Sequence, residues 1–212
     1  MKDNQTIDRI CAHIKRKIMT KETFPGCRLV EEDLAAELGV SRTPLRQAFA
    51  ILQSEGFVNT IPNRGTYVIQ PTYEEIVEVY QARMFLEQGL LADVFETLQE
   101  EKLDAIRENY EKQMKLGLNF KMLDYSILNR EFHILLASLS KNVYLKRFVM
   151  ELYNRIFVFL VYYDNSVTNN GSILTHGKIV KALEEREKDA LMAALREDAD
   201  LGTRDIGRGR NI

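Results

Sequence analysis

The chain has 212 residues, of which 45% are hydrophobic and 28% are charged, a composition that excludes a disordered or collagen-like protein. The formal net charge is −2. Residues 1–70 nevertheless carry an excess of basic side chains and residues 71–212 an excess of acidic ones, as expected when one part of a chain meets an anionic partner.

Several sequence features predict where the protein works. Residues 1–9 contain no apolar signal segment. The longest uncharged apolar run, residues 156–163, is much shorter than the roughly 20 residues that cross a bilayer. Cys11 and Cys27 are isolated, so neither a disulfide framework nor a paired-cysteine site is indicated. We therefore expect a cytoplasmic protein with no membrane partner.

Proline predicts the division of the chain into domains. All 4 prolines lie in the first 71 residues, and residues 72–201 contain none. Because proline disfavours helix in the residue before it, Pro71 is a natural joint between the two parts. We expect one domain over residues 1–71 and a second over residues 72–212.

The beginning of the chain predicts three helices in succession. Isoleucines at spacings of three to four indicate an amphipathic helix over residues 5–20. A second, short helix over residues 31–38 ends at Gly39, which suits the left-handed position after a helix. Ser41 can then cap a third helix, which ends at Gly56.

A β-hairpin is predicted directly after the third helix. The runs 57–61 and 66–69 are β-branched or aromatic, and they flank a turn at residues 62–65 that contains proline, asparagine and glycine. Two helices joined by a short turn and followed by a hairpin form the order of a winged helix-turn-helix.

The third helix and the hairpin supply candidate contacts to DNA. Arg42, Thr43 and Arg46 lie near the N-terminus of the helix, where a recognition helix meets base edges, and a guanidinium matches guanine bidentately. The two arginines have no acid between them, which is unfavourable unless an anion arrives. At the hairpin tip, Gly65 lets the backbone approach DNA closely, and Arg64 can enter the minor groove or contact a phosphate. The alternative is an ordinary solvated basic face.

Residues 72–212 predict an all-helical domain. Helical periodicity continues with short joints and one polar, asparagine-rich loop at residues 165–171. The predicted helices cover residues 73–98, 101–117, 120–140, 143–164, 173–186 and 187–205. Together they predict an antiparallel bundle, so that the fold class is mainly α.

Three segments carry a resemblance to a known family. LAAELGVSRTPLRQAF (residues 34–49), LQSEGF (52–57) and NRGTYV (63–68) resemble the DNA-binding domain of GntR-family regulators. The helical half is similar to the FCD effector domain of the FadR subfamily. One departure concerns Glu32, which stands where some members carry an arginine that contacts DNA. Because a carboxylate repels phosphate, that contact is not carried over.

The resemblance implies a function and its partners. It implies a transcriptional regulator, expected to be a repressor, whose dimer binds an inverted-repeat operator in double-stranded DNA and responds to a small-molecule effector, expected to be an organic acid. Arg42, Thr43, Arg46 and Gly65 are its implied contacts to the operator.

The resemblance also implies a divalent metal site in the helical domain. Many members hold the metal through Asp and His four residues apart on one helix and two later His. The corresponding residues here are Asn129, His133, His176 and Asp198, so that two positions match and two are substituted. Two imidazoles, one carboxylate and one amide oxygen can bind Zn²⁺, Mn²⁺ or Ni²⁺. The alternative is a lost site in which the histidines only line a pocket.

Two arginines of the helical domain are candidates for effector binding. Arg83 interrupts an apolar helical stripe, and a buried arginine needs a partner because an unpaired buried charge is costly. It either pairs with Glu87 one turn later or holds an effector carboxylate. Arg155 is a weaker candidate of the same kind.

Two other functions are alternatives to an effector-responsive regulator. One is a DNA-binding dimer whose effector pocket has decayed, which the substituted metal ligands suggest. The other is a metal-dependent enzyme on a helical bundle, which is disfavoured because no nucleophile–base pair is evident. We therefore do not expect an enzyme.

Overall fold

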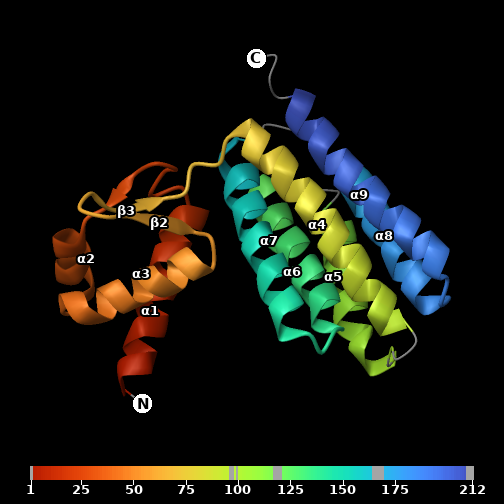
Figure 1. Ribbon diagram of the computed structural model, residues 1–212, viewed down its shortest axis with the longest axis horizontal. Helices are drawn as coiled ribbons and strands as arrows, with labels where there is room; N and C mark the ends of the chain where they lie inside the picture. Colours follow the sequence, from red (N-terminus) through yellow and green to blue (C-terminus); the bar gives the residue numbers. More distant parts are fainter. Residues whose placement is uncertain (1, 96–97, 99, 117–120, 164–169, 209–212) are drawn as a thin grey trace. The chain divides into compact units, whose positions relative to one another are not determined.

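The computed structural model describes residues 2–208 except 96–97, 99, 117–120 and 164–169. The chain divides into two compact units, Met1–Pro71 and Thr72–Ile212 (Figure 1). Each unit is described by itself below. Among the described residues, no helix is both long enough and apolar enough to span a membrane.

The first unit combines three helices with a small sheet. Its elements are α1 (Lys2–Met19), β1 (Arg28–Leu29), α2 (Glu31–Leu38), α3 (Arg42–Ser54), β2 (Val58–Ile61) and β3 (Gly65–Val68). The strands are antiparallel in the order β1-β3-β2. The apolar face of α1 packs against α3, where Ile10, Leu45 and Leu52 are fully buried. At the N-terminus of α3, Arg42 and Thr43 are exposed.

The sequence predicted the three helices of this unit, but not the absence of a side-chain cap on α3 and not the strand β1. Gly39 ends α2 in the left-handed conformation with φ 63°, as expected, and its N–H donates to the carbonyl of Ala35. Ser41 stands at the N-cap of α3, but the expected side-chain cap is absent. The two-residue strand β1 was not predicted, because a strand of Arg28 and Leu29 is too short to show alternation.

The second unit is a bundle of helices. In its described part the elements are α4 (Tyr73–Val94), the short 3₁₀ helix η2 (Glu100–Lys102), α5 (Asp104–Leu116), α6 (Met122–Ser138), α7 (Val143–Tyr163), α8 (Asn170–Glu184) and α9 (Lys188–Arg208). Thr72 caps α4 by accepting a hydrogen bond from the N–H of Glu75 at 3.1 Å. These elements confirm the mainly α fold class.

Several helix boundaries of this unit differ from the prediction, and the end of α4 and the start of α8 are two examples. The helix expected over residues 73–98 ends at Val94 and is followed by η2, since periodicity alone does not show where a helix stops. α8 begins at Asn170 instead of residue 173. The rest of the predicted loop, residues 165–169, lies outside the described residues.

The helices of the bundle form a closed ring. Contacts run from α4 to α7, α6, α5, α8, α9 and back to α4. Most of the interior is apolar, with Ile76, Phe132 and Leu195 fully buried. The same interior also buries Arg83 and His133, so that a polar cluster lies inside a hydrophobic core.

Candidate functional site

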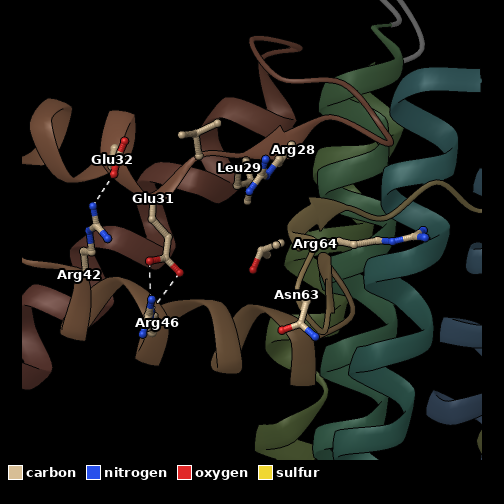
Figure 2. A pocket seen from close by; sticks show the side chains of 11 residues that line it. Arg28, Leu29, Glu31, Glu32, Arg42, Arg46, Asn63 and Arg64 are labelled. Atoms are coloured by element: carbon tan, nitrogen blue, oxygen red, sulfur yellow. Dashed lines mark hydrogen bonds and ion pairs between the residues drawn. The ribbon is translucent and has the colours of Figure 1, made fainter.

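A groove on the first unit is lined mainly by charged side chains. It encloses about 440 Å³ beside β1, the N-terminal ends of α2 and α3, and the turn between β2 and β3 (Figure 2). Its charged residues are Arg28, Arg42, Arg46, Arg64, Glu31 and Glu32. Four guanidinium groups against two carboxylates give the groove a net positive charge, so it favours an anionic partner.

No acid stands between Arg42 and Arg46 in the sequence, but both arginines have an acidic partner on α2. A terminal nitrogen of Arg42 donates to Glu32, and Nε of Arg46 donates to both carboxylate oxygens of Glu31 at 3.1 Å each (Figure 2). The hydrogen bond to Glu31 raises the pKa of Arg46. The acids belong to α2 and precede their partners by 10 and 15 residues, so only the packing of α2 beside α3 brings them together.

The hairpin turn completes the groove. The N–H of Arg64 donates to the carbonyl of Ile61 at 3.0 Å, and Gly65 has φ 108°, a conformation that favours glycine. A Cβ at Gly65 would lie 2.9 Å from Nε of Arg28, so glycine leaves room for that side chain. Within the described ranges, the guanidinium groups of Arg28 and Arg64 have no hydrogen bond or ion pair. Thr43 is exposed in the first turn of α3.

Sequence reasoning missed Arg28 as part of this groove. No helical or strand periodicity marks it, and the strand that positions it is two residues long. Its strand neighbour across the sheet is Tyr67 of β3, which places it beside the hairpin. Only this pairing reveals that Arg28 lies with the other arginines.

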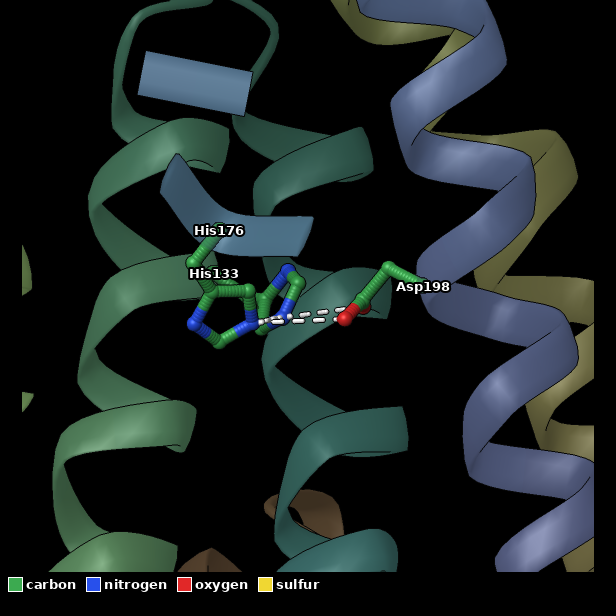
Figure 3. A group of neighbouring side chains, drawn as sticks. All are labelled: His133, His176 and Asp198. Carbon is green, nitrogen blue, oxygen red and sulfur yellow. Dashed lines mark hydrogen bonds and ion pairs between the residues drawn. The ribbon is translucent and has the colours of Figure 1, made fainter. Parts of the chain in front are cut away.

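A second candidate site lies inside the helical unit. His133 of α6, His176 of α8 and Asp198 of α9 are buried, and their ligand atoms lie within 4.8 Å of one another (Figure 3). The two Nε2 atoms are 3.2 Å apart. Asp198 Oδ2 lies 3.5 Å from Nε2 of His133, and Asp198 Oδ1 lies 3.4 Å from Nε2 of His176. Residues far apart in sequence thus form one group of donors.

The opposite ring nitrogens of the two histidines are held by other buried side chains. Nδ1 of His133 lies 2.8 Å from Glu87 Oε1, and Nδ1 of His176 lies 2.6 Å from Gln113 Oε1. The amide nitrogen of Gln113 donates to Asn109, which fixes the oxygen toward His176. In the tautomer in which each Nδ1 donates to these oxygens, the lone pair of each Nε2 faces the cluster.

Arg83 lies at the edge of this cluster. It is 1% exposed, it donates to Asp198 Oδ2, and its Nε lies 3.6 Å from Glu87 Oε2. The ion pair with Glu87, one of the two alternatives for Arg83, is therefore present, together with a partner 115 residues away that no local pattern could indicate. The guanidinium also lies 4.9 Å and 5.2 Å from the ring centroids of Tyr80 and Tyr153.

The electrostatics of the cluster favour ionised acids and a neutral imidazole. Burial would raise the pKa of Asp198, but Arg83 and both histidines hold that pKa well below its ordinary value. Burial would also raise the pKa of Glu87, but His133 and Arg83 lower that pKa below its ordinary value. Burial lowers the pKa of His133 in spite of Glu87, so its ring is neutral at pH 7.

Two further predicted site residues have partners of their own. Asn129 is buried, and its Oδ1 accepts a hydrogen bond from the hydroxyl of Tyr125 at 3.2 Å. Arg155 is half-buried on α7 and pairs with Glu75 at 2.8 Å and with Glu151 at 3.6 Å. The structure adds partners that the sequence did not assign to the cluster. Only Glu87 had a local signal, because it stands one turn after Arg83. The added residues are Glu87, Gln113, Tyr153, Ser172 and Thr175.

Two families match the chain in consecutive segments. Residues 6–68 match the bacterial regulatory proteins of the gntR family, and residues 78–200 match the FCD domain. The groove lies within the first match. The histidines and Asp198 lie within the second.

Similar proteins include several bacterial regulators. The uncharacterized HTH-type transcriptional regulator YdhC of Bacillus subtilis is 28% identical over 82% of this chain and 80% of its own length. The Nta operon transcriptional regulator of Aminobacter aminovorans is 33% identical over 62% of each protein. The gluconate operon transcriptional repressor of Bacillus licheniformis is 26% identical over 91% of this chain and 81% of its own length.

Solved structures share the fold. McbR/YncC of E. coli has a TM-score of 0.81 with 22% identity, covering 97% of this chain and 99% of that one. A putative transcriptional regulator GntR from Rhodococcus has a TM-score of 0.80 with 24% identity, covering 95% and 97% of the two chains.

Proposed function

Because the chain belongs to the gntR family of bacterial regulatory proteins and carries an FCD domain, we propose that it is a repressor whose residues 1–71 bind an operator and whose residues 72–212 sense a small organic acid. The protein is a DNA-binding transcriptional regulator and not an enzyme. We place its helical domain in the FadR subfamily. Because operator DNA of bacteria lies in the cytoplasm, we propose that the protein acts there.

The observation that carries the DNA contact is the basic groove at the N-terminus of α3. A helix N-terminus with two arginines and a neighbouring hairpin suits the major groove and an adjacent phosphate or minor groove. We assign operator contacts to Arg42, Thr43, Arg46, Arg64 and Gly65. Arg46 is the assigned base reader, because it lies one turn inside the helix, beyond the first-turn position of Arg42.

The DNA contact is tested by binding-site selection from a random duplex pool, followed by Arg46→Ala. The selected site should contain guanine, and the variant should lose about 5- to 150-fold in the ratio of specific to nonspecific affinity, as for one bidentate base contact. A variant that keeps the wild-type ratio would show that Arg46 reads no base.

We also propose that the protein is a homodimer and that its operator is an inverted repeat. A single winged helix makes few phosphate contacts, so two copies are needed for tight binding at physiological salt. A closed dimer with twofold symmetry reads two half-sites related by the same symmetry.

The donor set of the helical domain fits a divalent metal. The two Nε2 atoms lie 3.2 Å apart, and in the tautomer in which both Nδ1 atoms donate, their lone pairs face each other and can bind one cation. Atoms bound at about 2.0–2.1 Å from Zn²⁺ at tetrahedral angles lie about 3.3 Å apart, close to the observed separations. We propose that His133, His176 and Asp198 hold Zn²⁺, Mn²⁺ or Ni²⁺, and that Asn129 is a weak fourth ligand.

The effector would meet this cluster. A bound metal supplies a Lewis-acidic position for a carboxylate, and Arg83 could release Asp198 or Glu87 in exchange for the effector's carboxylate. Arg155 is a second candidate anchor, in exchange with Glu75. A gluconate operon repressor among the relatives supports an organic acid as the class of effector.

Elemental analysis and thermal shift test this part of the proposal. Protein purified without chelators should contain stoichiometric metal, and an organic-acid library should raise Tm only when the metal is present. A protein that takes up no metal at micromolar Zn²⁺, Mn²⁺ or Ni²⁺ would instead favour the decayed-pocket alternative.

A further inference from the structure

We propose that Glu31 is a positioning residue for operator recognition: it orients the Arg46 guanidinium for a base while leaving both terminal nitrogens of that group open. The adjacent Glu32 pairs with Arg42 in a way that obstructs DNA contact instead. This inference rests on the proposed contact between Arg46 and a base.

The atoms that form the two ion pairs differ. Glu31 accepts hydrogen bonds from Nε of Arg46, which lies 3.1 Å from each carboxylate oxygen of Glu31 (Figure 2). In the part of the chain that the structure describes, only Nε of Arg46 is engaged, so its two terminal nitrogens, which carry four of the five N–H donors, remain available. Guanine O6 and N7 can be met by those two nitrogens at the same time. The pair with Glu31 is therefore compatible with base recognition.

The burial of Glu31 suits it to hold another side chain in place. Its side chain is 29% exposed, whereas that of Arg46 is 66% exposed. A long exposed arginine without a partner loses rotamer freedom when it binds. The cost of immobilising one such side chain corresponds to about 2- to 12-fold in affinity. Glu31 removes part of this cost before the DNA arrives.

The pair of Glu32 has the opposite character. A terminal nitrogen of Arg42 donates to Glu32, so the pair occupies an atom that a phosphate would need. Both side chains are largely exposed, at 58% for Arg42 and 73% for Glu32. Arg42 must leave Glu32 before it can neutralise a phosphate, and this exchange weakens binding to any DNA sequence alike.

The two acids therefore form a matched experimental pair. They are neighbours in the first turn of α2 and carry the same charge, so a general repulsion of phosphate affects both in the same way. Only Glu31 should alter the discrimination between sequences. The readout that separates the roles is the ratio of specific to nonspecific affinity, together with its salt dependence.

The experiment uses the full chain, the duplex that the wild-type protein selects from a random pool, and a scrambled duplex of the same composition. Glu31→Ala should lower the affinity ratio about 2- to 12-fold. Glu32→Ala should raise the affinity for both duplexes and leave their ratio unchanged. It should also steepen the slope of log K against log salt by up to about 0.9, because one more phosphate is neutralised. Glu31→Gln keeps an oxygen acceptor for Nε and should restore most of the ratio.

Each outcome bears on the inference. If Glu31→Ala and Glu32→Ala change the ratio equally, or if Glu31→Ala leaves it unchanged, Glu31 acts only through its charge and the inference is overturned. If Arg46→Ala lowers the ratio while Glu31→Ala does not, the base contact stands and the positioning role alone fails. If Arg46→Ala keeps the ratio, the base contact fails and takes the inference with it. Circular dichroism and thermal unfolding of each variant check that α2 remains folded.

Discussion

Replacing Arg83 with methionine should strongly destabilise the helical unit. Arg83 is 1% exposed and pairs with both Asp198 and Glu87. Methionine has a similar length but no charge, so the variant leaves two buried carboxylates without their cation. Removing one partner of a buried ion pair costs about 3–5 kcal/mol. For a domain of this size, such a loss lowers Tm by about 6–20 °C.

The pH dependence provides a second signature of the same perturbation. Asp198 has a lowered folded-state pKa, so it stabilises the fold above its unfolded pKa of about 3.9, and this contribution is lost as pH falls through the folded value. Without Arg83, the pKa values of Asp198 and Glu87 rise and the two groups can take up protons. The stability difference between wild type and variant should therefore be largest near pH 7 and should shrink toward about pH 5.

Urea and thermal unfolding in the presence of a chelator measure both effects. Arg107→Met is the matched control: Arg107 pairs with Glu100, Asp104 and Glu184, but those acids are exposed, and exposed ion pairs are screened by water. It should therefore change Tm little. A Tm for Arg83→Met equal to that of wild type would refute the argument that Arg83 balances two buried acids.

Four further outcomes are expected. The double variant His133→Ala, His176→Ala should contain no metal by elemental analysis yet bind scrambled DNA as wild type does, and a variant that retains metal would exclude the proposed ligands. In wild type, metal affinity should fall with falling pH, because both rings must be neutral to coordinate. Gly202→Ala should lower the free energy of unfolding by about 1–3 kcal/mol, because its Cβ would lie 2.1 Å from Tyr80 Cε1, and an unchanged urea midpoint would contradict this close packing. Light scattering should show a dimer at micromolar concentration, whereas a monomer that still binds the selected site would contradict the inverted-repeat proposal.

Local sequence patterns determined the elements of this protein. The isoleucine spacing of α1 and the glycine that ends α2 act over a few residues, and helix periodicity and capping are themselves local properties. The segment from residue 34 to residue 68 was also sufficient to indicate the family, because it combines the helix-turn-helix with its hairpin. The candidate metal ligands His133 and His176 could be named in the same way, through the resemblance.

Only the tertiary structure decided which of these side chains act together. The pairing of Arg46 with Glu31 depends on how α2 packs beside α3, and the pairing of Arg83 with Asp198 joins residues 115 positions apart. Asn129 stands four residues before His133 but bonds to Tyr125, while Glu87 from another helix holds the imidazole. A spacing of four places two side chains on one face of a helix. Which neighbouring helix supplies the partner depends on packing between distant segments, and no local pattern encodes that.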